Sequence, residues 1–441
     1  MIRSRAAGAL LLLSVLCSLA ACDNPTDVGG ELVPGEGAGP QRVVLKPGAG
    51  LDVDTTRYAP ETGTSLPGEI DVARFLAGRQ EAVPPAFGKA EATGYIDVER
   101  ASAPSDLEGR DIDSVNVELV ADYAYGDTTR PTRLSLHDLT EEWDVGNTRA
   151  DTSFAPGFAE NAPITTFTAA RGDTLTVPLP RDWIRDHAGE LNTPGDTAFA
   201  EAFHGFQVRA AGETGVVGFT SSAARMRVFY EPPADEQAAT AVYSLTEQLT
   251  TVRSSGRASD GDESDGDESD GDNRRTLIQD GTGRVLSFEL DPPDSLRSVA
   301  VNNAALILEA DTTLETLPEG FRRPQLRRLE LRDAPPGDEN DRLPGGLFLD
   351  FNAASGRFEN SFALRDLVQD VLNGTVDYGE IQVRAPRRLV SVPRVGNLPV
   401  PVPSLNSALI CRDASDDAGA GDGACSGPPR LELLYTPLED E

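Results

Sequence analysis

The chain is poor in the side chains that most often carry catalysis and metal binding. It has only 3 histidines, 4 cysteines and 2 tryptophans among 441 residues. No two of its histidines have the i, i+4 spacing of a zinc-binding helix. The sequence also lacks G-x-S-x-G, which would place a nucleophilic serine on a strand-to-helix turn. These absences argue against a zinc hydrolase and a serine hydrolase, and we predict no cofactor, metal site or catalytic residue.

The sequence around each histidine favours a structural role. His137 lies in an expected strand with leucines at alternate positions, so we expect its ring to face solvent. His187 lies near the end of a short expected helix, where the helix dipole favours a positive charge. His204 precedes a glycine at the start of a strand.

Basic residues are also scarce, and almost all of them are arginines. The chain has 72 acidic and 39 basic residues, a formal charge of −33, and Lys46 and Lys89 are its only lysines. Repulsion by this charge argues against binding to nucleic acid or anionic lipid. The arginine bias is most simply an effect of codon composition. Such acidity is also typical of proteins adapted to near-molar salt, where the Debye length falls to about 3 Å.

The N-terminus has the features of an export signal. Arg3 and Arg5 precede an apolar run, Ala6–Ala21, which is too short to span a bilayer comfortably. The run ends in Leu-Ala-Ala-Cys, which resembles the lipobox of bacterial lipoproteins. The resemblance implies that Cys22 receives a diacylglyceryl group on its sulfur, becomes the first residue of the mature chain and is acylated on its amino group. The alternative is an ordinary secretory signal with an incidental cysteine.

We therefore expect residues 1–21 to be a lipoprotein signal peptide. Residues 22–39, rich in Gly, Pro and acids, are predicted to be a flexible tether. The protein would reside in the cell envelope, at the outer membrane or the cell surface, with its lipid in the membrane.

The two remaining cysteines, Cys411 and Cys425, are predicted to form a disulfide because an exported chain meets an oxidising compartment. A bridge across this short loop is worth about 3 kcal/mol in the chain-entropy model. The alternative is two unpaired surface thiols.

Short runs of alternating apolar and polar residues predict a mostly β protein, and Val115–Tyr123 is the clearest. Helical signals are sparse: residues 180–187 allow a short helix, and residues 361–372 allow a longer one that ends at Asn373-Gly374. Many short strands separated by turn residues favour β-sandwiches of the jelly-roll type.

Three sequence landmarks occur twice and in the same order, which predicts two related tandem β-sandwich domains, residues 40–250 and 276–441. The paired landmarks are Val117–Asp122 with Leu306–Asp311, Phe206–Ala210 with Ile381–Ala385, and Met226–Tyr230 with Leu431–Tyr435. Between the domains, residues 251–275 contain SDGDESDGDESDGD and are predicted to be a disordered acidic linker.

The linker supplies carboxylates that could bind calcium, but their spacing does not fit an EF-type loop. Such a loop needs oxygen ligands at positions 1, 3 and 5 and a glycine at position 6. Counted from the first linker aspartate, position 6 is Asp265 and Gly266 follows one place late. A solvated spacer is therefore favoured over a calcium site. The aspartates are Asp260, Asp262, Asp265, Asp267, Asp270 and Asp272.

Two further stretches leave alternatives open. Glu141 and Glu142 precede Trp143, an acid pair beside a residue that can stack on sugars, although a buried tryptophan with solvated glutamates is favoured. Residues 386–405 are apolar and rich in proline, which excludes a central strand. They form either an edge arm that docks on a partner or an irregular loop that covers the second domain's edge.

At these landmarks the chain resembles a family of two-domain lipoproteins of the Bacteroidota with no assigned activity. The likeness includes Asp27–Leu32 after the lipobox, Asp113–Leu119, Leu139–Glu141 and Asn302–Leu306. Through Glu141–Trp143 the first half is also similar to jelly-roll carbohydrate-binding modules of bacterial surface proteins. The resemblance implies the fold and the envelope location.

We therefore expect a noncatalytic binding or structural module for a glycan or another envelope protein. The alternative is an extracellular glycan hydrolase that uses paired carboxylates, which the many acids of this chain neither exclude nor identify.

Overall fold

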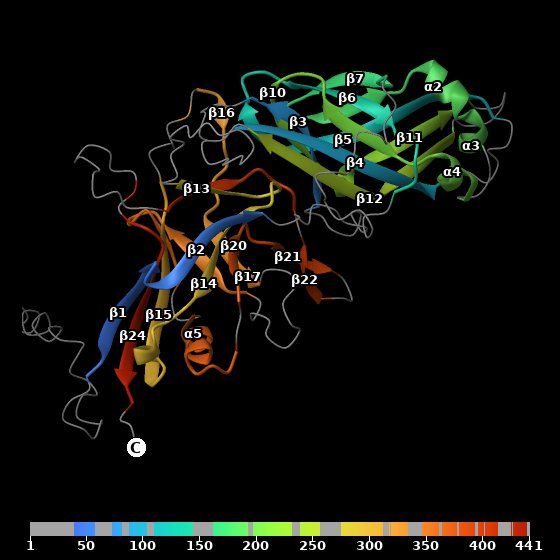
Figure 1. Ribbon diagram of the computed structural model, residues 1–441. Coiled ribbons are helices and arrows are strands. Elements are labelled where there is room, and N and C mark those ends of the chain that lie inside the picture. Colours follow the sequence, from blue (N-terminus) through green and yellow to red (C-terminus); the bar gives the residue numbers. More distant parts are fainter. Residues whose placement is uncertain are drawn as a thin grey trace, which may run out of the picture.

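The structure is a computed structural model, and it is mostly β, as predicted (Figure 1). It describes residues 39–57, 73–81, 88–103, 110–143, 162–192, 197–231, 239–255, 275–311, 317, 319–333, 346–360, 364–376, 379–392, 396–400, 402–412, 425 and 427–438. The signal peptide, Cys22 and almost all of the tether lie outside these residues. The linker aspartates, for which a solvated spacer is favoured over a calcium site, lie outside them as well.

The first large sheet lies at the top right of Figure 1 and curls into a closed ring. Its strands are β3 (Arg74–Gln80), β4 (Lys89–Ser102), β5 (Ile112–Asp127), β6 (Thr132–Asp138), β7 (Thr165–Ala169), β8 (Thr174–Pro178), β9 (Phe206–Ala210), β10 (Thr214–Thr220), β11 (Arg225–Tyr230) and β12 (Ala239–Ser255). They run in the order β12-β11-β5-β10-β3-β4-β9-β6-β7, and a further pairing of β12 with β4 closes the ring. Strand β8 pairs with β5.

Short helices follow β8 and pack against one end of this first domain. They are α2 (Arg181–Asp186), α3 (Ala188–Asn192) and α4 (Thr197–Ala202), with a 3-10 turn η4 (Ser221–Ala223) further along the chain. Trp183 and Ile184 of α2 are buried in the same core as Phe206 of β9 and Val117 of β5. The helix predicted over residues 180–187 is therefore confirmed.

The second large sheet is also closed. Its strands are β1 (Gln41–Pro47), β2 (Gly50–Arg57), β13 (Arg275–Gln279), β14 (Arg284–Leu290), β15 (Val299–Glu309), β17 (Arg328–Asp333), β18 (Phe348–Asn352), β19 (Arg357–Glu359), β20 (Ile381–Arg384), β23 (Ser407–Cys411) and β24 (Arg430–Pro437). They run in the order β2-β1-β24-β15-β19-β18-β17-β20-β14-β13-β23, and β2 also pairs with β14.

One helix packs against this second domain, and three elements lie outside its ring. Helix α5 (Leu364–Leu372) buries Leu364, Leu367, Val368 and Leu372, and Gly374 follows it with a φ of 66°. This confirms the predicted C-terminal end of the helix, because a left-handed residue after the last turn is easiest for glycine. The other elements are the 3-10 turn η5 (Asp294–Leu296), strand β16 (Phe321–Arg322), which pairs with β5, and the separate hairpin β21 (Arg388–Val392) and β22 (Gly396–Val400).

The repeated landmarks take equivalent places in the two sheets. Met226 of β11 pairs with Val117 of β5, and its counterpart Leu431 of β24 pairs with Leu306 of β15. The middle landmark behaves alike, because β9 lies between β4 and β6 while β20 lies between β14 and β17. The first and third landmarks therefore pair in the same register in both sheets, which supports the prediction of two related β-sandwich units.

The first strands of the chain do not belong to the first domain. Strand β1 pairs with β24 and β2 pairs with β14, so residues 41–57 close the second ring. In the first domain, β12 takes this same place between β11 and β4. Leu45 and Leu51 are buried in the second core as a result.

The predicted boundary at residue 40 is therefore wrong. An alternating pattern indicates a strand but does not specify which sheet edge the strand will join. The predicted linker is also too long at its start, because residues 251–255 complete β12. The remaining linker residues, 256–274, are not described.

The disulfide between Cys411 and Cys425 is present, with the two Cα atoms 5.5 Å apart, as predicted. Cys411 ends β23 and is completely buried. The residues between the two cysteines lie almost entirely outside the described part of the chain.

Deleting residues 39–57 should unfold the second domain and leave the first one intact. The deletion exposes the paired edges of β24 and β14 and removes Leu45 and Leu51, each worth about 1.5–3 kcal/mol when buried. Both tryptophans, Trp143 and Trp183, lie in the first domain, so their emission reports on that domain alone.

For the deletion variant, the circular dichroism should show a smaller β signal than wild type already without denaturant. In denaturant titrations, the unfolding transition followed by tryptophan emission should keep the wild-type midpoint. Val44→Thr is a suitable control because Val44 of β1 is exposed. An equal loss in both probes would contradict the assignment of β1 and β2 to the second domain.

Candidate functional site

The two domains meet at a buried tyrosine. Tyr123 of β5 donates a hydrogen bond to the Asn406 Oδ1 atom (3.2 Å) and accepts one from the Leu405 backbone N–H (2.9 Å). Leu405 is fully buried and packs in a cluster with Leu76, Tyr125 and Val252 of the first domain. Burial raises the pKa of Tyr123 well above the usual value for a tyrosine, so its hydroxyl stays protonated.

A second contact joins the domains through backbone pairing. The short strand β16 lies along β5, with Phe321 opposite Asp127 and Arg322 opposite Gly126. The Thr128 N–H also donates to the Gly320 carbonyl at 2.8 Å. These bonds fix the segment that precedes β17 against the first domain.

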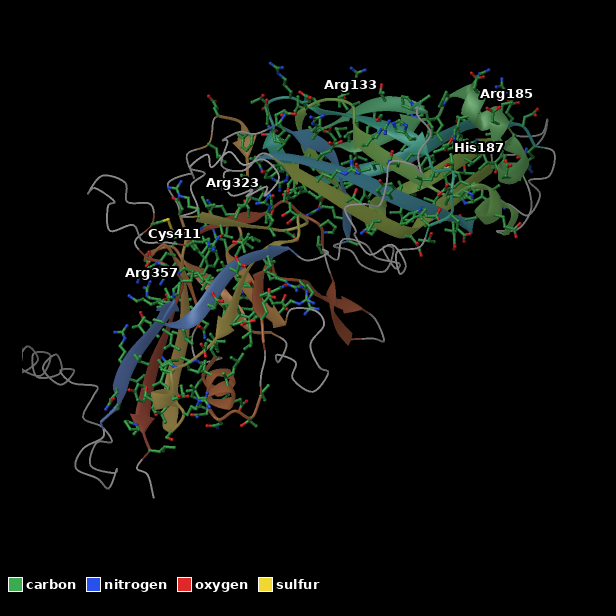
Figure 2. The ribbon with its side chains drawn as sticks, viewed as in Figure 1. Arg133, Arg185, His187, Arg323, Arg357 and Cys411 are labelled. Atoms are coloured by element: carbon green, nitrogen blue, oxygen red, sulfur yellow. A yellow bond between two sulfur atoms is a disulfide. The ribbon has the colours of Figure 1, made fainter. Side chains whose placement is uncertain are left out.

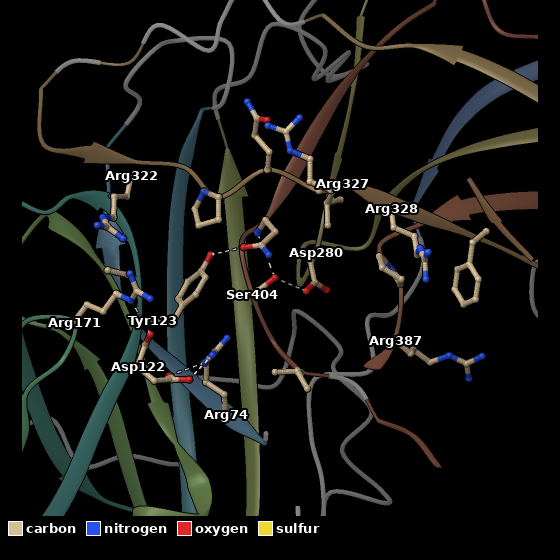
Figure 3. A pocket seen from close by; sticks show the side chains of 18 residues that line it. Arg74, Asp122, Tyr123, Arg171, Asp280, Arg322, Arg327, Arg328, Arg387 and Ser404 are labelled. Atoms are coloured by element: carbon tan, nitrogen blue, oxygen red, sulfur yellow. Dashed lines mark hydrogen bonds and ion pairs between the residues drawn. The ribbon is translucent and has the colours of Figure 1, made fainter. Parts of the chain in front are cut away.

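A cavity of about 730 Å³ opens between these contacts (Figure 3). Among the described residues, six arginines and two carboxylates, Asp122 and Asp280, line it. The arginines are Arg74, Arg171, Arg322, Arg327, Arg328 and Arg387. The volume falls within the range of pockets that hold a small ligand.

The arginines form two groups on opposite sides of the cavity. In Figure 3, Arg74, Arg171 and Arg322 lie on the side of the first domain, and Arg327, Arg328 and Arg387 lie on the other. Between them stand Tyr123, Ser404 and Asp280. The Ser404 hydroxyl donates to Asp280 at 2.5 Å, and its oxygen accepts from the Asn406 N–H at 3.3 Å.

Three of the six arginines are neutralised by ion pairs. Arg74 binds both carboxylate oxygens of Asp122, with its Nε atom 2.8 Å from Oδ1. Arg328 pairs with Asp350 (2.6 Å) and Arg387 with the buried Glu330 (3.0 Å). These pairs hold three guanidinium groups in place around the cavity.

The other three keep their charge available to a ligand. The Arg171 side chain donates to the Asp122 backbone carbonyl at 2.9 Å, and the Arg327 guanidinium lies over the Phe351 ring, 4.7 Å from its centroid. Within the described ranges, Arg171, Arg322 and Arg327 have no carboxylate partner, and all three are exposed. The cavity therefore concentrates positive charge in a chain with a formal charge of −33. Guanidinium forks in this arrangement bind carboxylates, sulfates or phosphates.

The proline-rich stretch of residues 386–405 borders this cavity. Its two strands, β21 and β22, pair only with each other among the described strands. Arg387 precedes the hairpin and Val402 follows it, and both residues line the cavity. The stretch therefore forms a hairpin outside both large sheets, in keeping with prolines that cannot join a central strand.

The histidines lie apart from the cavity. His137 is buried, so the expectation that its ring faces solvent is wrong, and Arg209 of the neighbouring strand β9 donates to its Nε2 atom at 3.1 Å. His187 ends α2 as predicted, with its Nδ1 atom 2.9 Å from the Trp183 carbonyl, and Figure 2 places it at the far end of the first domain. The backbone carbonyl of His204 accepts a hydrogen bond from Trp143.

The acid pair beside Trp143 is not a sugar platform. Trp143 is buried, its Nε1 atom donates to the His204 carbonyl at 2.9 Å, and its ring packs near Tyr95. Glu141 and Glu142 are exposed. The favoured prediction of a core tryptophan with solvated glutamates is confirmed.

Comparisons with known proteins add no further candidate for the site. No family model and no curated protein sequence matches this chain. Within the described ranges, no group of three or more His, Cys, Asp or Glu side chains is arranged to hold a metal ion. No helix in the described part of the chain is both long and apolar enough to cross a bilayer.

The sequence alone did not reveal the cavity. Its arginines come from β3, the residues between β7 and β8, and a stretch that starts at β16 and ends just after β20, so no local motif connects them. The one available signal was the choice of arginine over lysine, which was attributed to codon composition.

The stability of the first domain depends on pH through Asp97 of β4. Burial raises its pKa from 3.8 to about 6, a hydrogen bond from the Val98 N–H opposes this shift, and the nearby Glu247, Glu99 and Glu142 add to it. The folded state therefore holds its proton more tightly than the unfolded state. The resulting stabilisation is complete below about pH 4 and is lost as the pH rises through about 6.

Asp97→Asn should therefore stabilise the first domain at pH 7 by about 1–2 kcal/mol, allowing for partial exposure of the group, with little effect at pH 4. Denaturant unfolding followed by tryptophan emission at both pH values measures this. Asp113→Asn, at an exposed strand position, is the matched control. A pH-independent difference between wild type and Asp97→Asn would refute the raised pKa.

Proposed function

We propose that this chain is a lipid-anchored envelope protein that acts as a noncatalytic binding module, with the cleft between its domains as the binding site. Its ligand is a glycan or another envelope protein that carries anionic groups. The lipid anchor is attached at Cys22, and the protein resides at the outer membrane or the cell surface.

The observation that carries this proposal is the concentration of arginines in the cleft. Self-repulsion among six guanidinium groups in one cavity opposes folding unless carboxylates or a ligand compensate for it. Only part of that compensation comes from Asp122, Asp350 and Glu330. An anionic ligand would supply the remainder, while the acidic outer surface would repel anions elsewhere.

The arrangement of the chain supports presentation of the cleft away from the membrane. The expected tether leads directly to β1, which belongs to the second domain. The second domain would therefore stand next to the bilayer, and the first domain and the junction would lie beyond it.

A glycan hydrolase with paired carboxylates is the alternative function. Asp122 and Asp280 are the carboxylates that line the cleft. Asp122 is engaged by Arg74 through both oxygens, which leaves neither oxygen placed for proton transfer to a substrate. Loss of a glycan-cleaving activity in Asp280→Asn would favour the hydrolase.

The anchor is tested on protein purified from its native membrane. Mass spectrometry should find a mature chain that begins at Cys22 and carries lipid on that residue. Cys22→Ser should release the protein from the membrane fraction. A native chain that begins elsewhere, or that begins at Cys22 without lipid, would contradict the anchor.

The binding site is tested with the double variant Arg171→Glu, Arg322→Glu in the mature chain, screened against a glycan array and against solubilised envelope proteins. Loss of two hydrogen-bonded charges should weaken binding at least about tenfold. Arg185→Glu is the control, because Arg185 lies on α2 at the far end of the first domain (Figure 2). Unchanged binding in the double variant would place the site outside the cleft.

A further inference from the structure

A second cavity adjoins the first. It has a volume of about 570 Å³ and shares four lining residues with the arginine cleft: Asp122, Ala124, Arg171 and Arg322. Because the same side chains line both spaces, Arg171 and Arg322 lie at the boundary that the two cavities share. The two adjoining cavities, which lie at the domain junction, are together called the groove.

Positive charge continues into this second cavity. Arg130, which follows β5, lines its wall and is exposed, and Asp127 contributes a carboxylate that interacts with it. The groove thus carries Arg130 in the second cavity, Arg171 and Arg322 at the shared boundary, and Arg327 in the first cavity. A single small anion would satisfy one or two of these groups, whereas a chain with repeated negative charges would engage all of them.

The side chains between the arginines are suited to hydroxyl groups. Asp280, Ser404 and Asn406 line the first cavity, and Thr128 and Thr132 line the second. The carboxylate of Asp280 would repel an uninterrupted row of anions, but it accepts hydrogen bonds from neutral hydroxyls. Acidic sugars present both kinds of group, with a carboxylate or sulfate next to several hydroxyls.

An acidic peptide fits the groove less well. Extended peptides commonly bind by adding a strand to a free sheet edge. At this groove, the end of β5 is already paired with β16 of the same chain, at Gly126 and Asp127. The backbone N–H and C=O groups that would bind a peptide strand here are therefore already hydrogen-bonded to β16.

We propose that the groove binds a linear acidic glycan, whose chain runs across the domain junction and whose carboxylates or sulfates meet the arginines of both cavities. This inference rests on the cleft being the binding site, and it adds the chemical class and the extended form of the ligand.

Calorimetry on the mature chain with a size series of oligouronates, from the disaccharide upward, tests the inference. Affinity should rise with length until both cavities are filled and then level off, and it should fall with added salt. Arg130→Gln should weaken binding of the longer oligomers about tenfold and leave disaccharide binding unchanged, because only long chains reach Arg130. Sulfated oligosaccharides of equal length identify which anionic group is preferred, and Arg185→Gln is the control.

The outcomes separate this inference from the proposed function. Equal affinity for the disaccharide and longer oligomers, or no effect of Arg130→Gln, would overturn the extended acidic glycan. Tighter binding of a neutral glycan, or of a polyglutamate peptide of equal charge, would also overturn it. If the double variant Arg171→Glu, Arg322→Glu abolished binding of that neutral glycan or peptide, the cleft would remain the binding site. If no ligand binds the wild type, or if a ligand that binds is unaffected by Arg171→Glu, Arg322→Glu, both proposals fail.

Discussion

The second β ring is closed by strands from the start of the chain. Strands β1 and β2 precede the first repeat but close the second ring, between β24 and β14. Strand β12 directly follows the first repeat and closes the first ring, between β11 and β4. Without these strands the backbone groups of both ring edges would lose their partners. The place of β1 and β2 therefore ties the start of the chain to the second domain through the backbone.

The junction between the two domains has a dry, buried part and a part that is open to water. Tyr123, Leu405 and their neighbours form a dry contact, in which an unpaired Leu405 N–H would cost about 1–3 kcal/mol. Beside it lies the arginine cleft, open to water and only partly neutralised. The dry part fixes the separation of the two domains, and this separation sets the distance between the two groups of arginines.

Local patterns in the sequence predict where strands and helices lie better than they predict which strands pair with each other. The alternation in Val115–Tyr123 and the stop at Gly374 identify β5 and the end of α5, because each depends on neighbouring residues. The recurring landmarks also predict matching strand pairs. The place of β1 could not be predicted in this way, since any open edge of matching register accepts an apolar strand. The burial of His137 could not be predicted either, because its partner Arg209 is distant in the sequence. The cleft arginines are scattered from Arg74 to Arg387 for the same reason.

The place of β1 also determines how the protein would respond to mechanical force. With the proposed lipid anchor, tension in the tether would enter at Gln41, at the N-terminal end of β1, whose neighbour β24 is antiparallel and paired with it from Gln41 to Leu45. A pull along β1 loads the interstrand hydrogen bonds in shear, so that they resist together, whereas a sideways pull would break them one by one. If the proposed surface protein were pulled by flowing liquid, the pairing of β1 with β24 in the second domain would therefore be the part of the fold that bears the force.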